Sequence, residues 1–385
     1  MRIAVPREID ADEQRVALVP SEMTKLVKSA HSVIIEAGAG SGSGYTDEEY
    51  RQAGADIRRS PAELYKDADV VFKVRPPKED EIRQLRKGAV LICFLEVLRE
   101  PGIAQKLADQ GVTAVALEMV PRISRAQSMD ALSSQASAAG YKAMLIGAEA
   151  IRKYFPMLTT AAGTIRPARV FVLGAGVAGL QAIATARRLG ALVEAFDIRA
   201  AAKGEVESLG AKFVDIDLGE SGEAEGGYAK EISEKAKERE HALIKEVIAR
   251  SDVVVTTAAV PGKKAPVLVT EDMVAAMKTG SVIVDMAVEQ GGNVAGSQAG
   301  KKVMVNGVAI IAPVNLPSQM AIHTSQLLAR NLVTLFMHLA HDGKLELDFK
   351  DEITAGAVIT HGGEIVHERT KELVHDDKTE RKNHA

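Results

Sequence analysis

Short apolar runs alternate with amphipathic segments along the first 135 residues of the chain. The apolar runs predict strands at residues 3–5, 33–35, 70–72, 90–95 and 112–117. The segments between them predict helices at residues 21–28, 47–53, 61–66, 79–85 and 102–110. Strands that alternate with helices favour a parallel sheet covered by helices on both faces. This region of the chain is therefore expected to form a Rossmann-like domain.

A second alternating stretch follows, and two long segments with helical spacing flank it. Its apolar runs predict strands at residues 170–173, 192–196, 211–214, 252–255, 281–285 and 309–312. The long flanking helices are expected at residues 133–154 and 317–339, with a loop from Thr159 to Thr164. We therefore expect an α/β fold of two Rossmann-like domains with parallel sheets, joined by two long helices, with a cleft between them. The expected domains are residues 1–135 plus 325–385, which are discontinuous, and residues 136–324.

A glycine-rich turn follows the strand expected at residues 170–173. It reads Gly174-Ala175-Gly176-Val177-Ala178-Gly179, and a helical segment and a second strand ending at Asp197 come next. In a dinucleotide-binding turn, the first glycine allows the sharp bend and the second lets a pyrophosphate approach the backbone. The third lets the helix pack against the strand. The helix N-terminus adds N–H groups and a partial positive charge for the phosphates.

The acid at the end of the second strand indicates which nucleotide binds. Asp197 can accept hydrogen bonds from both hydroxyls of an adenosine ribose and would repel a 2′-phosphate, which favours NAD(H) over NADP(H). Arg199 is close enough in sequence to weaken that preference. A glycine turn without a ligand is the alternative, but strand, helix, second strand and acid all occur in the required order.

Between residues 217 and 251 the chain is longer than a minimal Rossmann unit requires. Leu218 to Tyr228 is rich in glycine and glutamate and can bury little apolar surface. It is either a surface insertion or a mobile flap, residues 218–228, that closes over a nucleotide or a partner with Tyr228 as its apolar anchor.

Charge and cysteine content exclude several classes of protein. The formal net charge is −4, from 48 basic and 52 acidic residues, so no basic surface for nucleic acid is indicated. The single cysteine, Cys93, leaves no internal disulfide and no cysteine metal cluster. No apolar run approaches the roughly 18 residues of a membrane span, so a cytoplasmic protein is expected. The histidines lack metal-ligand spacing, and no metal site is expected.

A polar loop from Pro121 to Ser133 precedes the first long helix. It contains Arg122, Gln127 and Asp130, which suit a site that faces a cleft. The alternative is a capped helix start, with Asp130 or Ser133 as the N-cap. Asp285, at the end of a later strand and before Gln290-Gly291-Gly292-Asn293, is also expected to face a ligand, because strand carboxyl ends in open parallel sheets do so.

With these motifs the chain resembles the NAD(H)-binding component of proton-translocating NAD(P) transhydrogenases, domain I in the form with a split α subunit. It is also similar to the related alanine dehydrogenases. The likeness covers nearly the whole chain, and its most specific motif is PRISRAQSMDALSSQ from Pro121. The remaining motifs are residues 3–8, Arg15-Val16-Ala17-Leu18, residues 174–197, Gly226-Gly227-Tyr228 and Val260-Pro261-Gly262-Lys263.

The resemblance implies roles for individual residues. At the nicotinamide end, Arg122 and Ser133 would contact NAD(H), and Gln127 and Asp130 would orient the two nicotinamides. The remaining implied contacts follow the order of the chain: Gly174, Gly176, Val177 and Gly179 at the pyrophosphate, Asp197, Ile198 and Arg199 at the adenosine, and Gly227 and Tyr228 in the mobile loop.

The resemblance also implies partners. The chain would be a homodimeric component that exchanges hydride with NADP(H) on a partner component, while a separate membrane component conducts protons. It would be cytoplasmic and associated with the inner membrane only through those partners.

Two other functions stay open. Arg15 and Lys73 match residues around the substrate of alanine dehydrogenases, but Glu96 stands where those enzymes have a histidine. Alanine oxidation needs a proton relay, whereas hydride exchange between nicotinamides needs only proximity and orientation. An NAD(H)-binding sensor without catalysis is the third possibility, and the intact polar loop argues against it.

Overall fold

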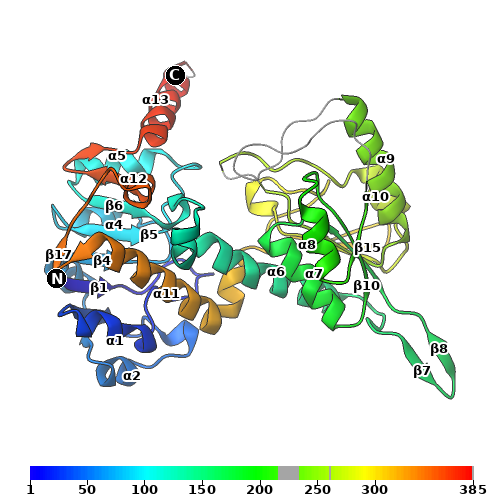
Figure 1. Cartoon of the computed structure of the whole chain (residues 1–385), viewed down its shortest axis with the longest axis horizontal. Coiled ribbons are helices and arrows are strands. Elements are labelled where there is room, and N and C mark those ends of the chain that lie inside the picture. Colours follow the sequence, from blue (N-terminus) through cyan, green and yellow to red (C-terminus); the bar gives the residue numbers. More distant parts are fainter. Residues whose placement is uncertain (216–233, 260–261, 384–385) are drawn as a thin grey trace. The chain divides into compact units, whose positions relative to one another are not determined.

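The computed structural model describes residues 1–215, 234–259 and 262–383. The chain forms two compact units, Met1–Gln135 with Ser318–Ala385, and Ala136–Pro317. The chain passes from the first unit to the second within helix α6 (Ala131–Ala150). It returns to the first unit within the 3₁₀ segment η5 (Leu316–Met320), just before helix α11 (Ala321–Leu339). Each unit is an α/β domain built on a sheet in which parallel strands dominate (Figure 1).

The first unit contains an eight-stranded sheet in the order β19-β18-β6-β5-β4-β1-β2-β3. Six of its strands pair in parallel: β1 (Arg2–Val5), β2 (Ser32–Glu36), β3 (Asp56–Arg58), β4 (Val70–Phe72), β5 (Val90–Cys93) and β6 (Thr113–Ala116). The C-terminal segment adds two antiparallel strands at one edge, β18 (Val358–His361) and β19 (Glu364–Ile365). A small separate hairpin joins β16 (Ala340–His341) and β17 (Lys344–Leu345).

Helices cover both faces of this sheet because its strands are apolar on both sides. Ile3 and Val5 face a core shared with α11, whereas Ala4 between them faces a second core on the opposite side. The first face is covered by α1 (Pro20–Lys28), α2 (Asp47–Gln52) and α11. The second is covered by α3 (Pro61–Asp67), α4 (Glu79–Gln84), α5 (Gly102–Asp109) and α13 (Glu368–Asn383). Helix α12 (Glu352–Ala357) packs against β18 and against the 3₁₀ turn η2 (Leu117–Met119) that follows β6.

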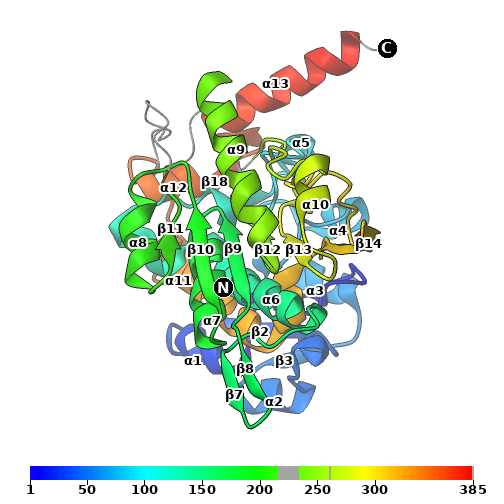
Figure 2. The same cartoon turned by 90° about the vertical axis from the view of Figure 1, so that its right-hand side faces the viewer.

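The second unit contains a seven-stranded sheet in the order β11-β10-β9-β12-β13-β15-β14. Its parallel strands are β9 (Arg169–Leu173), β10 (Leu192–Phe196), β11 (Lys212–Phe213), β12 (Val253–Thr256), β13 (Val282–Asp285) and β15 (Val308–Ile311). Strand β14 (Lys302–Val305) is antiparallel at the edge. Figure 2 shows β10, β9, β12 and β13 side by side, with α9 (Glu234–Arg250) crossing in front of them.

Again the strands alternate between two apolar cores. Val170 and Val172 pack with α6, α7 (Val177–Arg188) and α8 (Ala202–Ser208), and Phe171 packs with α9 and α10 (Glu271–Ala276). The strands expected from the apolar runs all end within two residues of the observed bounds.

The prediction of a loop from Thr159 to Thr164 is wrong. This stretch is a hairpin of β7 (Leu158–Thr160) and β8 (Gly163–Ile165), which extends away from the sheet of the second unit (Figure 1). The Thr159 and Thr164 side chains are hydrogen bonded across the strands at 3.2 Å, and Gly163 has φ of +120°. β-Branched residues favour strands, but the sequence offers too few apolar side chains here to predict one.

Candidate functional site

The glycine turn between β9 and α7 has a conformation that its residues require. Gly174 has φ of +95°, and a Cβ at this position would lie 2.6 Å from the Thr257 hydroxyl. A Cβ at Gly179 would lie 1.9 Å from the Gly174 carbonyl oxygen, so the helix packs directly against the turn. By contrast, a Cβ at Gly176 would meet no atom within 4 Å. The surrounding structure therefore leaves no room for a side chain at Gly174 or Gly179, whereas the space beside Gly176 is open.

Helix α7 begins at Val177 and carries no side-chain cap at Gly176. Its first intrahelical bond is donated by the Leu180 N–H to the Gly176 carbonyl, at 2.8 Å. The preceding N–H groups of a first turn have no partner within the helix, and they carry partial positive charge. The site can therefore offer backbone donors to a phosphate beside the open Gly176 position.

Asp197 connects the end of β10 to this turn. Its carboxylate accepts a hydrogen bond from the Ala175 N–H at 2.7 Å, and Arg199 donates from its backbone N–H at 2.8 Å and from Nε and Nη2 at 2.9 Å each. A carboxylate has about four acceptor positions, and these four donors occupy them. Asp197 can bind ribose hydroxyls only when the Arg199 side chain gives up its contacts. Ile198, between them, is half-buried.

A network of polar side chains after β12 and β13 supports the turn. Thr257 Oγ1 donates to the Gly174 carbonyl oxygen at 3.0 Å, and Asn293 bonds to both polar backbone atoms of the neighbouring Ala258. Asp285 accepts from the Asn293 N–H at 3.0 Å. Asp285 and Asn293 are completely buried. The expectation that Asp285 faces a ligand is therefore wrong, because its carboxylate is used to hold the chain that follows β13.

In the first unit, the loop from Pro121 to Ser133 includes the 3₁₀ segment η3 (Ser124–Met129). Its apolar side chains, Ala126 and Met129, are buried in the core. The Arg122 and Gln127 side chains are exposed. Within the part of the chain that the structure describes, the Gln127 side chain makes no hydrogen bond. The loop therefore separates an apolar face, which anchors it, from a polar face that is open to a ligand.

Asp130 and Ser133 lie together at the start of α6. The Asp130 carboxylate accepts from the Ser133 N–H at 2.8 Å and from its hydroxyl at 2.6 Å. Asp130 is thus the N-cap of the helix, as the capped-start alternative supposed. The cap does not exclude a second role, because both residues remain partly exposed.

Residues that follow β1 and β4 form a buried ionic cluster with Glu81 of α4. Lys73, which is 1% exposed, donates to Glu81 at 2.8 Å and to Glu8 at 3.3 Å. Burial opposes the charge on Lys73, but the two carboxylates outweigh it and raise the pKa of the ammonium group. Burial raises the pKa of Glu8, against the attraction of Lys73. Arg15 forms a similar buried pair with Glu13, whose oxygens lie 2.6 and 2.8 Å from its guanidinium nitrogens.

Glu96 follows β5 with φ of +55°, a strained conformation for this residue type. Its carboxylate lies 3.1 Å from Arg75 Nη1 and 3.2 Å from Arg99 Nη1. Glu118 holds the same turn, because its oxygens accept the N–H groups of Leu95 at 3.0 Å and Val97 at 3.3 Å. Burial raises the pKa of Glu118 to about 7.

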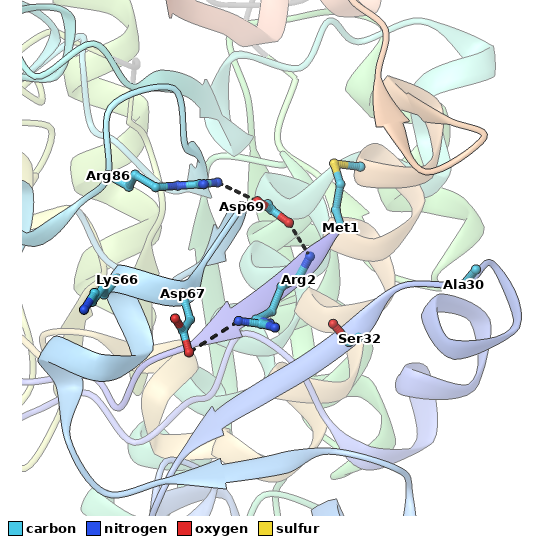
Figure 3. A pocket seen from close by; sticks show the side chains of 8 residues that line it. All are labelled: Met1, Arg2, Ala30, Ser32, Lys66, Asp67, Asp69 and Arg86. Carbon is cyan, nitrogen blue, oxygen red and sulfur yellow. Dashed lines mark hydrogen bonds and ion pairs between the residues drawn. The ribbon is translucent and has the colours of Figure 1, made fainter.

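A shallow groove of about 480 Å³ lies at the opposite, amino end of the same sheet (Figure 3). Arg2 pairs with Asp67 and Arg86 pairs with Asp69 across it. Both of its arginines and both of its aspartates are therefore paired, and the loop of Pro121 to Ser133 does not line it. We assign it no role.

Two expected site residues, Gly227 and Tyr228, and the whole flap of residues 218–228 lie outside the described residues. Within the described ranges, every helix is too short or too polar to traverse a bilayer. In those ranges no group of three or more His, Cys, Asp or Glu side chains is arranged to hold a metal ion. Sequence reasoning singled out neither Thr257 nor Asn331, which contacts the loop of the first unit, because neither belongs to a local motif.

Two family models together match most of the chain: "Alanine dehydrogenase/PNT, N-terminal domain" over residues 4–139 and "Alanine dehydrogenase/PNT, C-terminal domain" over residues 143–368. The sequence is 48% identical over 377 residues to the first of the parts that form NAD(P) transhydrogenase subunit alpha of Rhodospirillum rubrum, with 95% of this chain and 98% of that protein covered. A solved transhydrogenase structure from Sinorhizobium meliloti matches with a TM-score of 0.83 and 43% identity, over 95% of this chain and 99% of that one. An L-alanine dehydrogenase structure matches with a TM-score of 0.81 and 28% identity, over 98% and 99%.

Proposed function

Because the chain belongs to the alanine dehydrogenase/PNT family, we propose that it is the NAD(H)-binding component of a proton-translocating NAD(P) transhydrogenase. Hydride passes directly between NAD(H) on this chain and NADP(H) on a partner component. A separate membrane component couples that transfer to proton movement. The chain acts as a homodimer, is active only with its partners, and associates with the inner membrane through them from the cytoplasmic side.

The observation that carries this proposal is that one chain contains both an open glycine turn before a helix and an exposed polar loop. The turn fits a dinucleotide, because Gly176 leaves room beside an uncapped helix N-terminus. In this proposal Gly174, Gly176, Val177 and Gly179 bind the pyrophosphate. The adenosine end lies against Asp197, Ile198 and Arg199, and Gly227 and Tyr228 close over it.

Bound NAD(H) supplies or accepts the hydride at its nicotinamide, and this chain's residues orient it. Arg122 and Ser133 contact that nicotinamide, while Gln127 and Asp130 align it with the nicotinamide of the partner. No proton is gained or lost at the two reacting carbons, so the site needs position and water exclusion rather than an acid. The hydrogen bonds between Asp130 and Ser133 suit this role, because they fix two of the four side chains relative to each other.

A self-sufficient alanine dehydrogenase is the second candidate, favoured by the buried cations Arg15 and Lys73 and by the structural likeness to such an enzyme. It requires a proton relay near the substrate. Glu96, paired with Arg75 and Arg99, offers hydrogen-bond acceptors there instead of a histidine. The transhydrogenase role therefore accounts for more of the site.

A paired rate assay tests the proposal. One arm offers the purified chain NAD and L-alanine, and the other offers NADH and NADP with an added NADP(H)-binding transhydrogenase component. Turnover only in the second arm, dependent on the added component, is expected. Turnover only with alanine would make the chain a dehydrogenase.

A substitution tests the role of the loop. Gln127→Asn shortens the side chain by one methylene and is expected to slow hydride transfer while NADH affinity stays nearly unchanged. An unchanged rate in the assembled complex would remove Gln127 from the mechanism.

A further inference from the structure

Gln127, on the polar face of the loop, is exposed. Gln127 lies on the 3₁₀ segment η3, and within the described residues its side chain has no hydrogen-bond partner. Short 3₁₀ segments have poor hydrogen-bond geometry and are held by their surroundings. The groups that fix the backbone on either side of Gln127 therefore determine where this side chain points.

One buried side chain of α11 holds both sides of Asp130. Asn331 is 8% exposed, and its Nδ2 donates to the Ser128 carbonyl oxygen at 2.9 Å. Its Oδ1 accepts from the Ser134 hydroxyl at 2.7 Å. The amide thus uses one donor and its acceptor on the residues that flank the Asp130 cap. Asn331 thus joins the end of the loop to the start of α6, although it lies 203 residues from Ser128 and 197 residues from Ser134 in the chain.

A second anchor holds the loop on the other side of Gln127. Arg125 is hydrogen bonded to Asp351, which is the N-cap of α12 and accepts from the N–H groups of Ile353 and Thr354 at 3.0 Å each. The Asp351 carboxylate also lies 3.0 Å from His338 Nε2 of α11. Burial opposes the ionisation of Asp351. The bonds from Thr354, Arg125 and His338 outweigh it and hold the pKa of this carboxyl below its ordinary value.

The start of the loop is packed against helix α12. A Cβ at Gly356 of α12 would lie 3.2 Å from Pro121 Cδ and 3.3 Å from the Met119 carbonyl oxygen. The loop is therefore fixed at Pro121, at Arg125 and at Ser128 by residues of the C-terminal segment. Each support comes from beyond Ser318, although the loop itself belongs to the first 135 residues.

We propose that Asn331 and Asp351 are positioning residues for hydride transfer, which hold the loop so that Gln127 and Asp130 meet the reacting nicotinamides. This rests on the proposed transhydrogenase function. Hydride transfer requires an aligned near-attack geometry, and a displacement of about 1 Å costs about 10²-fold in rate. Most of the nucleotide affinity is expected from the glycine turn, which neither residue touches, and Asn331 and Asp351 do not themselves contact the nucleotide in this proposal.

The test compares Asn331→Ala with Thr334→Ala, a matched control. Thr334 lies on the same helix and is half-buried, and within the described residues its hydroxyl donates only to the Arg330 carbonyl of that helix, at 2.7 Å. Single-turnover hydride transfer from NADH to NADP, with the NADP(H)-binding component added, is expected to fall about 10- to 100-fold in Asn331→Ala. NADH affinity should stay within about threefold. Thr334→Ala should match the wild type in both. Arg125→Gln, which leaves the α12 cap in place, should slow transfer by a smaller factor.

Hydrogen exchange provides a readout without activity. Amides of residues 126–134 should exchange faster in Asn331→Ala and not in Thr334→Ala, with the melting temperature recorded for both. If Asn331→Ala fails to fold, Ser134→Ala, which loses one of the two Asn331 bonds, takes its place in every measurement. Wild-type hydride rates with a folded variant would overturn the inference, and so would a loss of rate matched by an equal loss of NADH affinity. Absence of transfer in the wild type would instead overturn the proposed function, and the exchange result would then decide the anchoring alone.

Discussion

The two sheets have central strands of the same kind, and they differ in the residues that follow. β1 is followed by Pro6, Arg7 and Glu8, whereas β9 is followed by a turn of three small residues that starts at Gly174. The Glu8 carboxylate accepts the Val74 N–H at 2.7 Å and pairs with Lys73, so the carboxyl edge of the first sheet satisfies its own donors.

The glycine turn does the opposite. It places no side chain at Gly176 and leaves the N-terminus of α7 uncapped. Parallel sheets of similar layout can therefore end in a closed ionic centre or in an open anion site. The choice is made by whether the first turn carries a carboxylate or a glycine, because only the glycine lets a ligand approach the backbone donors.

The strongest test of the closed centre removes its cation. Lys73→Met leaves the Glu8 and Glu81 carboxylates buried without their partner, and it should lower the free energy of unfolding by about 3–5 kcal/mol. Urea unfolding followed by circular dichroism measures this loss. Arg83→Met is the control, because Arg83 pairs with Glu79 on the surface at 3.5 Å and 62% of its side chain is exposed. Equal midpoints for the two variants would contradict a closed ionic centre.

Two glycine substitutions test the open site. Gly179→Ala forces a methyl group against the Gly174 carbonyl, so it should cost about 1–3 kcal/mol and abolish NADH binding. Gly176→Ala meets no atom of the protein, so its melting temperature should match the wild type while NADH affinity falls about tenfold or more. Calorimetry and NADH titration measure both. If Gly176→Ala bound NADH normally, the open position would not be where the phosphates lie.

The closed edge should also respond to pH. Burial raises the pKa of Glu118 from its ordinary 4.5 to about 7, so the folded state binds this proton more tightly than the unfolded state. The resulting stability is fully present below about pH 4.5 and is lost as the pH rises through about 7. Glu118→Gln removes this titration. Between pH 5 and 8 its free energy of unfolding should change by about 1–3 kcal/mol less than that of the wild type. Parallel pH profiles of the urea midpoint for both proteins would refute the assignment.

The smallest expected effect concerns nucleotide choice. Asp197→Ala removes a ribose acceptor and releases the Arg199 side chain, which is then available to a 2′-phosphate. NADH affinity should fall about tenfold, and NADPH affinity should fall less or rise. Fluorescence titration with both nucleotides measures the ratio. An equal loss for both would exclude Asp197 from discrimination.

Much of the fold could be predicted from the sequence, because the strands of both sheets are short apolar runs bounded by polar helices. Two of the strands that escaped prediction are only partly buried. Lys302–Val305 alternates exposed and half-buried residues at an edge, and Leu158–Thr160 is largely exposed. At the site, the order of Gly174, Gly176 and Gly179 was sufficient to locate the turn. The saturation of Asp197 by Arg199 was not predictable, because it depends on side-chain geometry.

The sequence by itself determined the α/β class, the position of the nucleotide turn and the polar loop before α6, because each depends on residues that are neighbours in the chain. Only the tertiary structure decided that Asp285 is buried and that Asn331 holds the loop. These depend on contacts between segments far apart in the chain, such as the 203-residue separation from Asn331 to Ser128. No local pattern records such contacts, since an asparagine in a helix has the same sequence signature whether its amide faces water or a distant carbonyl group.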